Sequence, residues 1–230
     1  MPGRPVLAID IGNSNLTATL VRDGAPGEVR RAVTERDATP ERVATIVAGL
    51  AEELAGADGA GAELAGIVAA SVVPSATAGL RHFAERHGLP LLLATHATVP
   101  IPIRVDRPET VGPDRLVNAY AAGRRYGTPC IVLDFGTATT LDVVGVDGAY
   151  LGGPIAPGLE LGLEALASRT ALLPRVELRL PERAIATETV GAIQAGAVLG
   201  HREMAAGLLR LVRAELAAAT GRPAESIRAV

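Results

Sequence analysis

Two stretches of the chain repeat one arrangement of residue types that suits phosphate chemistry. Residues 10–13 and residues 134–137 each give an aspartate, one apolar residue, a glycine and a short polar residue. A glycine lets the backbone approach a ligand closely, and successive N–H groups in a tight turn form an anion-binding concavity. A carboxylate at the same place can hold a hard cation, directly or through water. Each stretch could therefore bind a phosphate and its metal ion, although one copy alone is more simply a turn.

Hydroxyl groups around these turns could add hydrogen bonds to phosphate oxygens. They belong to Ser14, Thr17, Thr137, Thr139 and Thr140. A Walker A loop is excluded, because the chain contains no lysine. Charge on a transferred phosphoryl group would then be met by backbone amides, by a metal ion and by Arg115.

A longer repeat must position the two stretches. Each follows a short apolar run and precedes a run rich in β-forming residues. Each second run leads to an Asp-Gly dipeptide, at 23–24 and at 147–148, which is a strong hairpin signal. The interval from the first aspartate to this turn is identical in the two copies. The recurrence of a whole strand–loop–strand–turn unit favours two phosphate-binding hairpins over two unrelated turns.

The rest of the chain alternates between helical and extended patterns, which argues for an α/β fold. Two hairpin-led units further predict duplicated domains with an interdomain cleft, in which the hairpins would clamp a polyphosphate and its Mg²⁺. Thr39 is the predicted N-cap of the first helix, and the last helix is expected to break near Gly196 and Gly200. The predicted helices are 40–54, 75–87, 116–126, 159–170 and 189–218, and further strands are predicted at 64–73 and 89–94.

A charged pair stands where the helix that links the two halves is predicted to begin. Asp114 opens this helix and Arg115 follows it. Two interpretations of Asp114 stay open: an N-cap carboxylate, or the acceptor of a proton from a substrate hydroxyl. Arg115 could pair with a substrate carboxylate through two hydrogen bonds.

Composition narrows the class of protein. The 230 residues are 48% hydrophobic and 20% charged, which is ordinary for a globular protein with a core. The net charge of −3 gives no nucleic-acid footprint. No apolar run reaches the roughly 20 residues of a membrane span and the N-terminus does not read as a signal peptide, so we expect a cytoplasmic protein. Cys130 is predicted to be a buried structural thiol.

With these motifs, the sequence resembles the type III pantothenate kinases, whose fold is shared with actin and the sugar kinases. Five stretches carry the resemblance in the order and spacing of that family. They are 10–15, 112–119, 134–140, 152–158, and 187–190 together with 194–196.

The resemblance implies ATP-dependent phosphorylation of pantothenate to 4′-phosphopantothenate, the first step of coenzyme A biosynthesis. It implies an α/β fold of duplicated actin-like (ribonuclease H-like) domains, with residues 1–117 as the N-terminal domain and residues 118–230 as the C-terminal domain. It also implies a homodimer that has pantothenate and ATP as partners, without nucleic acid or membrane.

Roles for particular residues follow from the same resemblance. Asp114 would be the catalytic proton acceptor, Asp134 would hold potassium or ammonium, and Asp10 would lie near Mg²⁺. The substrate-binding residues would be Gly112, Pro113, Asp114, Arg115 and Thr189, of which Thr189 would otherwise pass for a helix cap. The ATP-binding residues would be Asp10, Ile11, Gly12, Asn13, Ser14, Asn15, Leu16, Thr17 and Thr137.

The sequence departs from the family pattern at several places. Pro113 replaces the usual alanine, Ser14 replaces a threonine, and residues 186–188 replace Gly-Lys-Asn. The run 227–230 reads as the start of a strand, which in the family continues into a glycine-rich turn and a helix that this sequence lacks. Two other functions therefore stay open: another small-molecule phosphotransferase or phosphatase of the same fold, and a non-catalytic regulatory relative.

Overall fold

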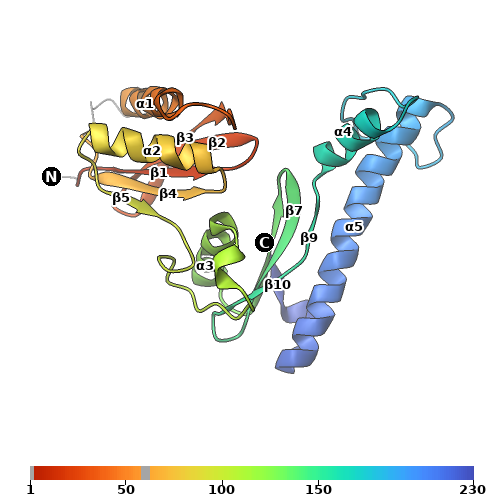
Figure 1. Ribbon diagram of the computed structural model, residues 1–230. Coiled ribbons are helices and arrows are strands. Elements are labelled where there is room, and N and C mark those ends of the chain that lie inside the picture. The colour runs from red at the N-terminus through yellow and green to blue at the C-terminus, as the bar shows by residue number, and fades with distance from the viewer. Residues whose placement is uncertain (1–2, 58–62) are drawn as a thin grey trace. The chain divides into compact units, whose positions relative to one another are not determined.

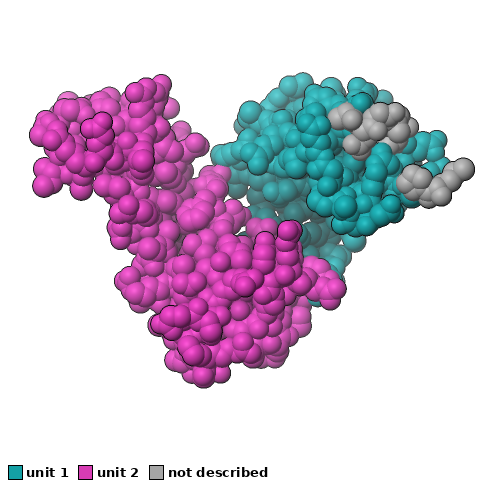
Figure 2. Space-filling view, turned by 180° about the vertical axis from the view of Figure 1, so that it is seen from behind, with its two compact units in different colours: residues 1–100, 107–117 teal, residues 101–106, 118–230 magenta. Residues whose placement is uncertain are grey.

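The chain divides into two compact units, which Figure 2 shows in different colours. Each unit has its own five-stranded sheet. The computed structural model describes residues 3–57 and 63–230. Unit 1 comprises Met1–Pro100 and Arg107–Val117, and unit 2 comprises Ile101–Asp106 and Asn118–Val230.

The sheet of unit 1 begins with an antiparallel meander and continues with parallel strands. Its order is β3-β2-β1-β4-β5, with β1 antiparallel to β2, β2 antiparallel to β3, and β4 parallel to both β1 and β5. The strands are β1 (Val6–Ile11), β2 (Asn15–Arg22), β3 (Ala25–Val33), β4 (Gly66–Ser71) and β5 (Leu91–Leu93).

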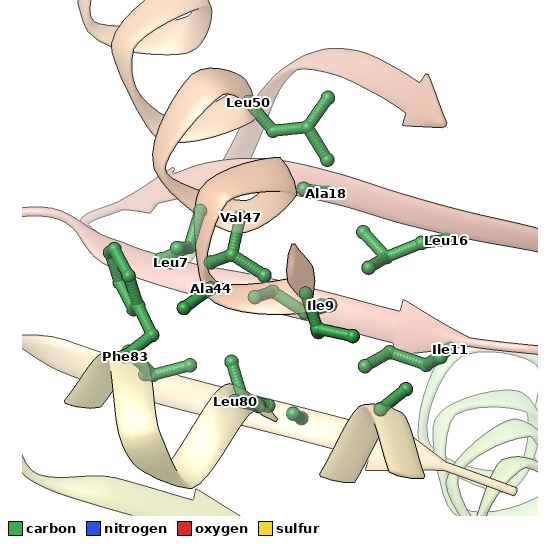
Figure 3. Close-up of a cluster of buried hydrophobic side chains, with 14 of the residues drawn as sticks. Leu7, Ile9, Ile11, Leu16, Ala18, Ala44, Val47, Leu50, Leu80 and Phe83 are labelled. Atoms are coloured by element: carbon green, nitrogen blue, oxygen red, sulfur yellow. The ribbon is translucent and has the colours of Figure 1, made fainter. Parts of the chain in front are cut away.

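Two helices supply the other half of the unit 1 core. Helix α1 (Pro40–Ala57) begins as predicted, because the Thr39 hydroxyl accepts a hydrogen bond from the Arg42 N–H at 3.3 Å. Helix α2 (Pro74–Arg86) approaches α1 so closely that a Cβ on Gly79 would overlap Val43. Alternate β1 and β2 side chains pack with apolar residues of both helices (Figure 3). The labelled members are Leu7, Ile9, Ile11, Leu16, Ala18, Ala44, Val47, Leu50, Leu80 and Phe83.

The sheet of unit 2 repeats this topology. In the order β10-β6-β7-β8, β6 is antiparallel to β7, β7 is antiparallel to β8, and β10 is parallel to β6. These four strands correspond, in that order, to β4, β1, β2 and β3 of unit 1. The α/β fold with duplicated actin-like domains is therefore confirmed, while the interdomain cleft stays a prediction. The strands are β6 (Cys130–Phe135), β7 (Ala138–Val144), β8 (Tyr150–Gly152), β9 (Ile155–Pro157), which also pairs with β7, and β10 (Arg228–Ala229).

The last long helix is continuous, so the predicted break near Gly196 and Gly200 is wrong. Helix α5, the long blue helix of Figure 1, runs unbroken over Thr189–Thr220. Each interior glycine costs about 1 kcal/mol of helix propensity, but burial of side chains such as Ile193 and Leu216 outweighs that cost. The remaining helices are η1 (Pro108–Thr110), α3 (Pro113–Tyr126), α4 (Leu159–Arg169) and η2 (Ala224–Ser226).

The proline-rich stretch before α3 joins the sheet of unit 2. Tyr150 donates its N–H to the Pro102 carbonyl at 2.8 Å and accepts from the Arg104 N–H at 2.9 Å. Ile103 therefore bridges Tyr150 in parallel, as an extended connector would. Among the described helices, none is both long and apolar enough to cross a membrane.

Candidate active site

The first predicted phosphate loop lies between β1 and β2. Asp10 is exposed at the end of β1 and stands directly opposite Thr17 of β2. Ile11 and Leu16, which flank the loop, are 0% and 3% exposed, so their side chains belong to the core. Any contact that these two residues make with a nucleotide must come from their backbone.

The segment that follows β3 holds the carbonyl groups of this loop. The Thr34 hydroxyl donates to the Gly12 carbonyl at 2.8 Å, and the Thr34 N–H donates to the Ser14 carbonyl at 2.9 Å. Arg36 Nε donates to the Asn13 carbonyl at 3.1 Å. Because C=O and N–H of one trans peptide point in opposite directions, the amides of the next residues face away from this segment. Sequence reasoning missed both Thr34 and Arg36, because they lie a whole strand beyond the motif.

The second predicted loop lies between β6 and β7 and is backed by the segment after β9. Gly158 donates its N–H to the Thr137 carbonyl at 3.0 Å. A Cβ on Gly158 would overlap the carbonyl oxygens of Gly136 and Thr137, so only glycine fits there. Gly158, the last residue of the glycine-rich stretch 152–158, therefore supports the loop.

One face of the second hairpin packs on α5. Thr139 is 1% exposed, and its hydroxyl lies 3.1 Å from Nε2 of His201 on α5. The ring of His201 also contacts Phe135, with ring centroids 6.0 Å apart. The expectation that the Thr139 hydroxyl binds phosphate is therefore wrong, because alternation along β7 turns this side chain toward the helix.

The opposite face of the same hairpin carries a row of polar side chains. Asp134 stands directly opposite Thr140 in the β6–β7 pair. Asn118 of α3 donates its side-chain amide to Asp134 Oδ2 at 3.2 Å. Further along β7, Asp142 is 0% exposed and accepts a hydrogen bond from the Tyr150 hydroxyl at 3.1 Å. Asn118 belongs to the stretch 112–119 that carries part of the family resemblance, but nothing in the sequence alone linked it to Asp134.

The predicted substrate loop leads directly into α3. Gly112 accepts from the Leu116 N–H, and Pro113 is the first helical residue, where a missing N–H costs nothing. Asp114 is therefore within the first turn rather than at the N-cap. Its Oδ1 accepts from the Arg115 N–H at 2.9 Å, and it gains from the helix dipole. This geometry removes the N-cap interpretation of Asp114 and leaves its proton-acceptor role as a prediction.

Thr189 is the first residue of α5, but it does not cap the helix. The carboxylate of Glu188 accepts from the N–H groups of Val190, at 2.8 Å, and of Gly191. Thr189 is exposed, and the N-cap of the helix is Glu188. Its contact with substrate stays a prediction.

The pKa values of Glu109 and Cys130 are shifted from their usual ranges. A hydrogen bond from its own backbone N–H, together with one from Arg107, holds the pKa of Glu109 below its usual range. Burial raises the pKa of the Cys130 thiol, which fits the predicted structural role.

Within 3–57 and 63–230, no group of three or more His, Cys, Asp or Glu side chains could hold a metal ion.

Comparison with known proteins places these motifs in one family. The family model for type III pantothenate kinase matches residues 6–211, which include both hairpins, the substrate loop and the start of α5. The chain belongs to the type III pantothenate kinase family.

Individual relatives agree with this assignment. A type III pantothenate kinase from Thermomicrobium roseum is 43% identical over 216 residues, covering 92% of this chain and 81% of that protein. One from Phenylobacterium zucineum is 41% identical over 213 residues, with 91% and 81% covered. Among solved structures, a Baf family protein from Campylobacter jejuni superposes with a TM-score of 0.54 at 16% identity, covering 88% of this chain and 78% of that chain. That likeness supports the fold alone.

Proposed function

We propose that this member of the family phosphorylates pantothenate at the expense of ATP, giving 4′-phosphopantothenate and ADP in the first step of coenzyme A biosynthesis. The observation that carries the proposal is the family match over residues 6–211, which contains every motif singled out above. The chain is accordingly a kinase that acts on an alcohol.

Asp114 is the proposed proton acceptor. The pantothenate hydroxyl oxygen attacks the γ-phosphorus, the bond from that phosphorus to the β,γ-bridging oxygen breaks, and the hydroxyl proton passes to the Asp114 carboxylate. The carboxylate is well placed to orient the hydroxyl, because it is fixed on the first turn of α3 by the Arg115 N–H. A loose phosphoryl-transfer transition state needs such orientation more than a strong base. Arg115 would pair with the pantothenate carboxylate through two hydrogen bonds.

The two hairpins are proposed to hold the triphosphate of ATP. Support for the first comes from its carbonyl groups, which Thr34 and Arg36 bind and which thereby fix the backbone of the loop. Support for the second comes from Thr137, which stands in a loop whose backbone Gly158 fixes. Thr189, exposed at the start of α5, is proposed to contact pantothenate.

Two cations accompany this proposal. Asp10 is proposed to bind Mg²⁺, and its exposed carboxylate at a strand end suits an ion that keeps most of its ligands from water and phosphate. Asp134 is proposed to hold potassium or ammonium, and it stands directly opposite Thr140 on the neighbouring strand. When bound, these ions supply positive charge that offsets the charge of the phosphates.

We also propose that the protein acts in the cytoplasm as a homodimer. Apolar side chains next to α4 and α5 support self-association: Leu172, Leu180 and Ile185 are 91%, 82% and 83% exposed. Light scattering coupled to size-exclusion chromatography tests the dimer, and a monomer at micromolar concentration would contradict it.

A coupled assay of ADP release with pantothenate, Mg²⁺ and K⁺ tests the function itself. The variant Asp114→Ala should lose activity by at least about a hundredfold, as removal of a general base does, while its thermal unfolding stays close to that of the unmodified chain. The matched control is Glu109→Gln, an exposed acid in the turn just before the loop that pairs with Arg107. Equal activity of Asp114→Ala and the control would overturn the proton-acceptor assignment. Turnover of a hexose in place of pantothenate would overturn the assignment of pantothenate as the substrate.

A further inference from the structure

A buried carboxylate stands beside the proposed cation residue without a part in the mechanism above. Asp142 of β7 is 0% exposed, and burial of an ionised carboxylate costs several kcal/mol unless hydrogen bonds compensate. Its Oδ1 accepts from the Tyr150 hydroxyl at 3.1 Å, and its Oδ2 accepts from the Thr140 hydroxyl at a long 3.4 Å. Nothing in the local sequence pattern assigns Asp142 a role, but its position in the sheet does.

Asp142 shares a face of the sheet with Asp134. Thr140 and Asp142 are two residues apart on β7 and project to the same side, and Thr140 stands directly opposite Asp134. Directly opposed side chains have Cβ atoms about 5 Å apart, and diagonal neighbours are about 7–8 Å apart. Thr140 therefore lies between two carboxylates.

Unit 1 has no such carboxylate at the equivalent place. In the first hairpin the residue opposite the aspartate is Thr17, and the residue two further along β2 is Thr19. The Thr19 hydroxyl turns to a backbone carbonyl of its own strand at 3.5 Å. The buried acid thus accompanies only the hairpin whose aspartate is proposed to hold a monovalent cation.

The hydrogen bond to Asp142 determines which further partners the Thr140 hydroxyl can bind. A threonine hydroxyl has one proton to donate and two lone pairs to accept with. Because the Thr140 hydroxyl donates its proton to Asp142, the lone pairs of the hydroxyl oxygen remain for another partner. An oxygen in this state suits a cation and does not suit a phosphate oxygen, which would need the proton.

We infer that Asp142, held by Tyr150, positions Thr140 as an oxygen ligand that completes the monovalent cation site of Asp134. The inference rests on the proposed function, because it presupposes the cation. The donors are oxygens that can bind a potassium ion or accept hydrogen bonds from ammonium, since Asp134 and Thr140 stand opposite each other on neighbouring strands. Asp142 is a positioning residue and touches neither substrate nor ion in this account.

Thermal unfolding in KCl and in NaCl at matched ionic strength tests the inference without turnover. The unmodified chain should unfold at a higher temperature in KCl, because an ion that binds the native state stabilises it. Thr140→Val and Asp142→Asn should lose most of this difference. In the coupled assay both should need about tenfold more K⁺ for half-maximal activation, as expected when a hydrogen bond to a charged group is lost.

Two further variants separate this role from a general loss of packing. Thr140→Ser keeps the hydroxyl and should retain the potassium response. Thr139→Val removes a hydroxyl from the same strand on the face toward α5, and it should lower stability equally in the two salts. If Thr140→Val and Asp142→Asn respond to potassium as the unmodified chain does, the inference is wrong and the proposed function stands. If the unmodified chain phosphorylates pantothenate without distinguishing K⁺ from Na⁺, the cation proposal and the inference both fail.

Discussion

The two hairpins share a motif but differ in loop length and in the elements that support them. In both, the strand-end aspartate stands opposite a threonine: Asp10 opposite Thr17, and Asp134 opposite Thr140. The loop between the last paired residues is 12–15 in the first hairpin and 136–138 in the second, so the second is one residue shorter. The strand register therefore keeps the aspartate–threonine pair while the loop between them varies.

The support of each loop comes from a different part of its unit. Thr34 and Arg36, just after the neighbouring strand β3, bind the carbonyl groups of the first loop. The second loop rests on Gly158, and its strand is fixed to α5 by His201. The two hairpins thus share the aspartate–threonine pairing, whereas the elements that support their loops differ.

The turns at the far ends of the hairpins differ as well. Asp23 and Gly24 both have positive φ, 50° and 80°, which is the two-residue turn that an Asp-Gly dipeptide favours. In the second hairpin only Gly148 has positive φ, at 79°, and Gly145 donates to the Ala149 carbonyl across a longer loop. The number of residues from the first aspartate to the Asp-Gly dipeptide is therefore the same in both hairpins. In the second hairpin, the shorter loop between β6 and β7 is offset by the longer turn after β7.

The largest expected difference between the hairpins is in their cation dependence. Asp10→Asn should lower kcat/KM by at least about a hundredfold, because the carboxylate proposed to hold Mg²⁺ is lost. Asp134→Asn should instead abolish the difference between KCl and NaCl in activity and in unfolding temperature. Steady-state kinetics over a matrix of Mg²⁺ and K⁺ concentrations measure both effects. Loss of the potassium response in Asp10→Asn with retention in Asp134→Asn would reverse the assignment of the two hairpins.

Alanine at one glycine of each loop should separate their supports. Gly158→Ala puts a Cβ into the carbonyl oxygens of Gly136 and Thr137, and such overpacking typically costs about 1–3 kcal/mol of unfolding free energy. A Cβ on Gly12 would meet the Asn15 carbonyl at 3.5 Å, an ordinary contact, so Gly12→Ala should leave the free energy of unfolding nearly unchanged. Denaturant titrations of both variants check the contrast. Equal destabilisation would show that the second loop is not held from behind as the structure indicates.

Removal of one support from the first loop should have a smaller effect, on ATP affinity. Thr34→Val deletes the hydroxyl that binds the Gly12 carbonyl, while the backbone bond to Ser14 remains. One neutral hydrogen bond is worth about 1 kcal/mol, so the KM for ATP should rise about fivefold with little change in kcat. Thr45→Val is a suitable control, because its hydroxyl binds a carbonyl within α1. A kcat effect larger than the KM effect would mean that the loop acts in the chemical step.

The smallest effect concerns the thiol at the start of β6, where β1 has Val6. Burial raises the pKa of Cys130, so the native chain should react with a thiol reagent at pH 8 far more slowly than the denatured chain. Above about pH 8.5 the unfolded thiol loses its proton while the native thiol keeps it, so the free energy of unfolding should fall slightly as pH rises. Cys130→Val should remove this alkaline component. Rapid labelling of the native chain would show that the second sheet opens readily.

Much of the fold could be predicted from local signals. Apolar periodicity and the Thr39 cap located α1, and the Pro74–Arg86 helix and the strands at the two hairpins followed from the same kinds of pattern. The break in α5 was predicted wrongly, because helix propensity ignores the packing that carries the helix past Gly196 and Gly200. The short strands β8 and β9 gave no pattern long enough to detect. The division at residues 117 and 118 and the roles of the individual site residues stay predictions.

The sequence by itself determined the motifs, their order and the family, because residue types at fixed spacing specify turns, strand ends and acidic positions. Only the tertiary structure decided which threonine hydroxyls of the second hairpin are available to bind a ligand. Thr139 and Thr140 are neighbours in sequence, yet side chains alternate between the two faces of β7. The Thr139 hydroxyl therefore lies beside His201, whereas Thr140 lies on the face that carries Asp134 and Asp142. It also decided that Glu188 rather than Thr189 caps α5 and that Asn118 binds Asp134. Such contacts join residues through the fold, and no local pattern records them.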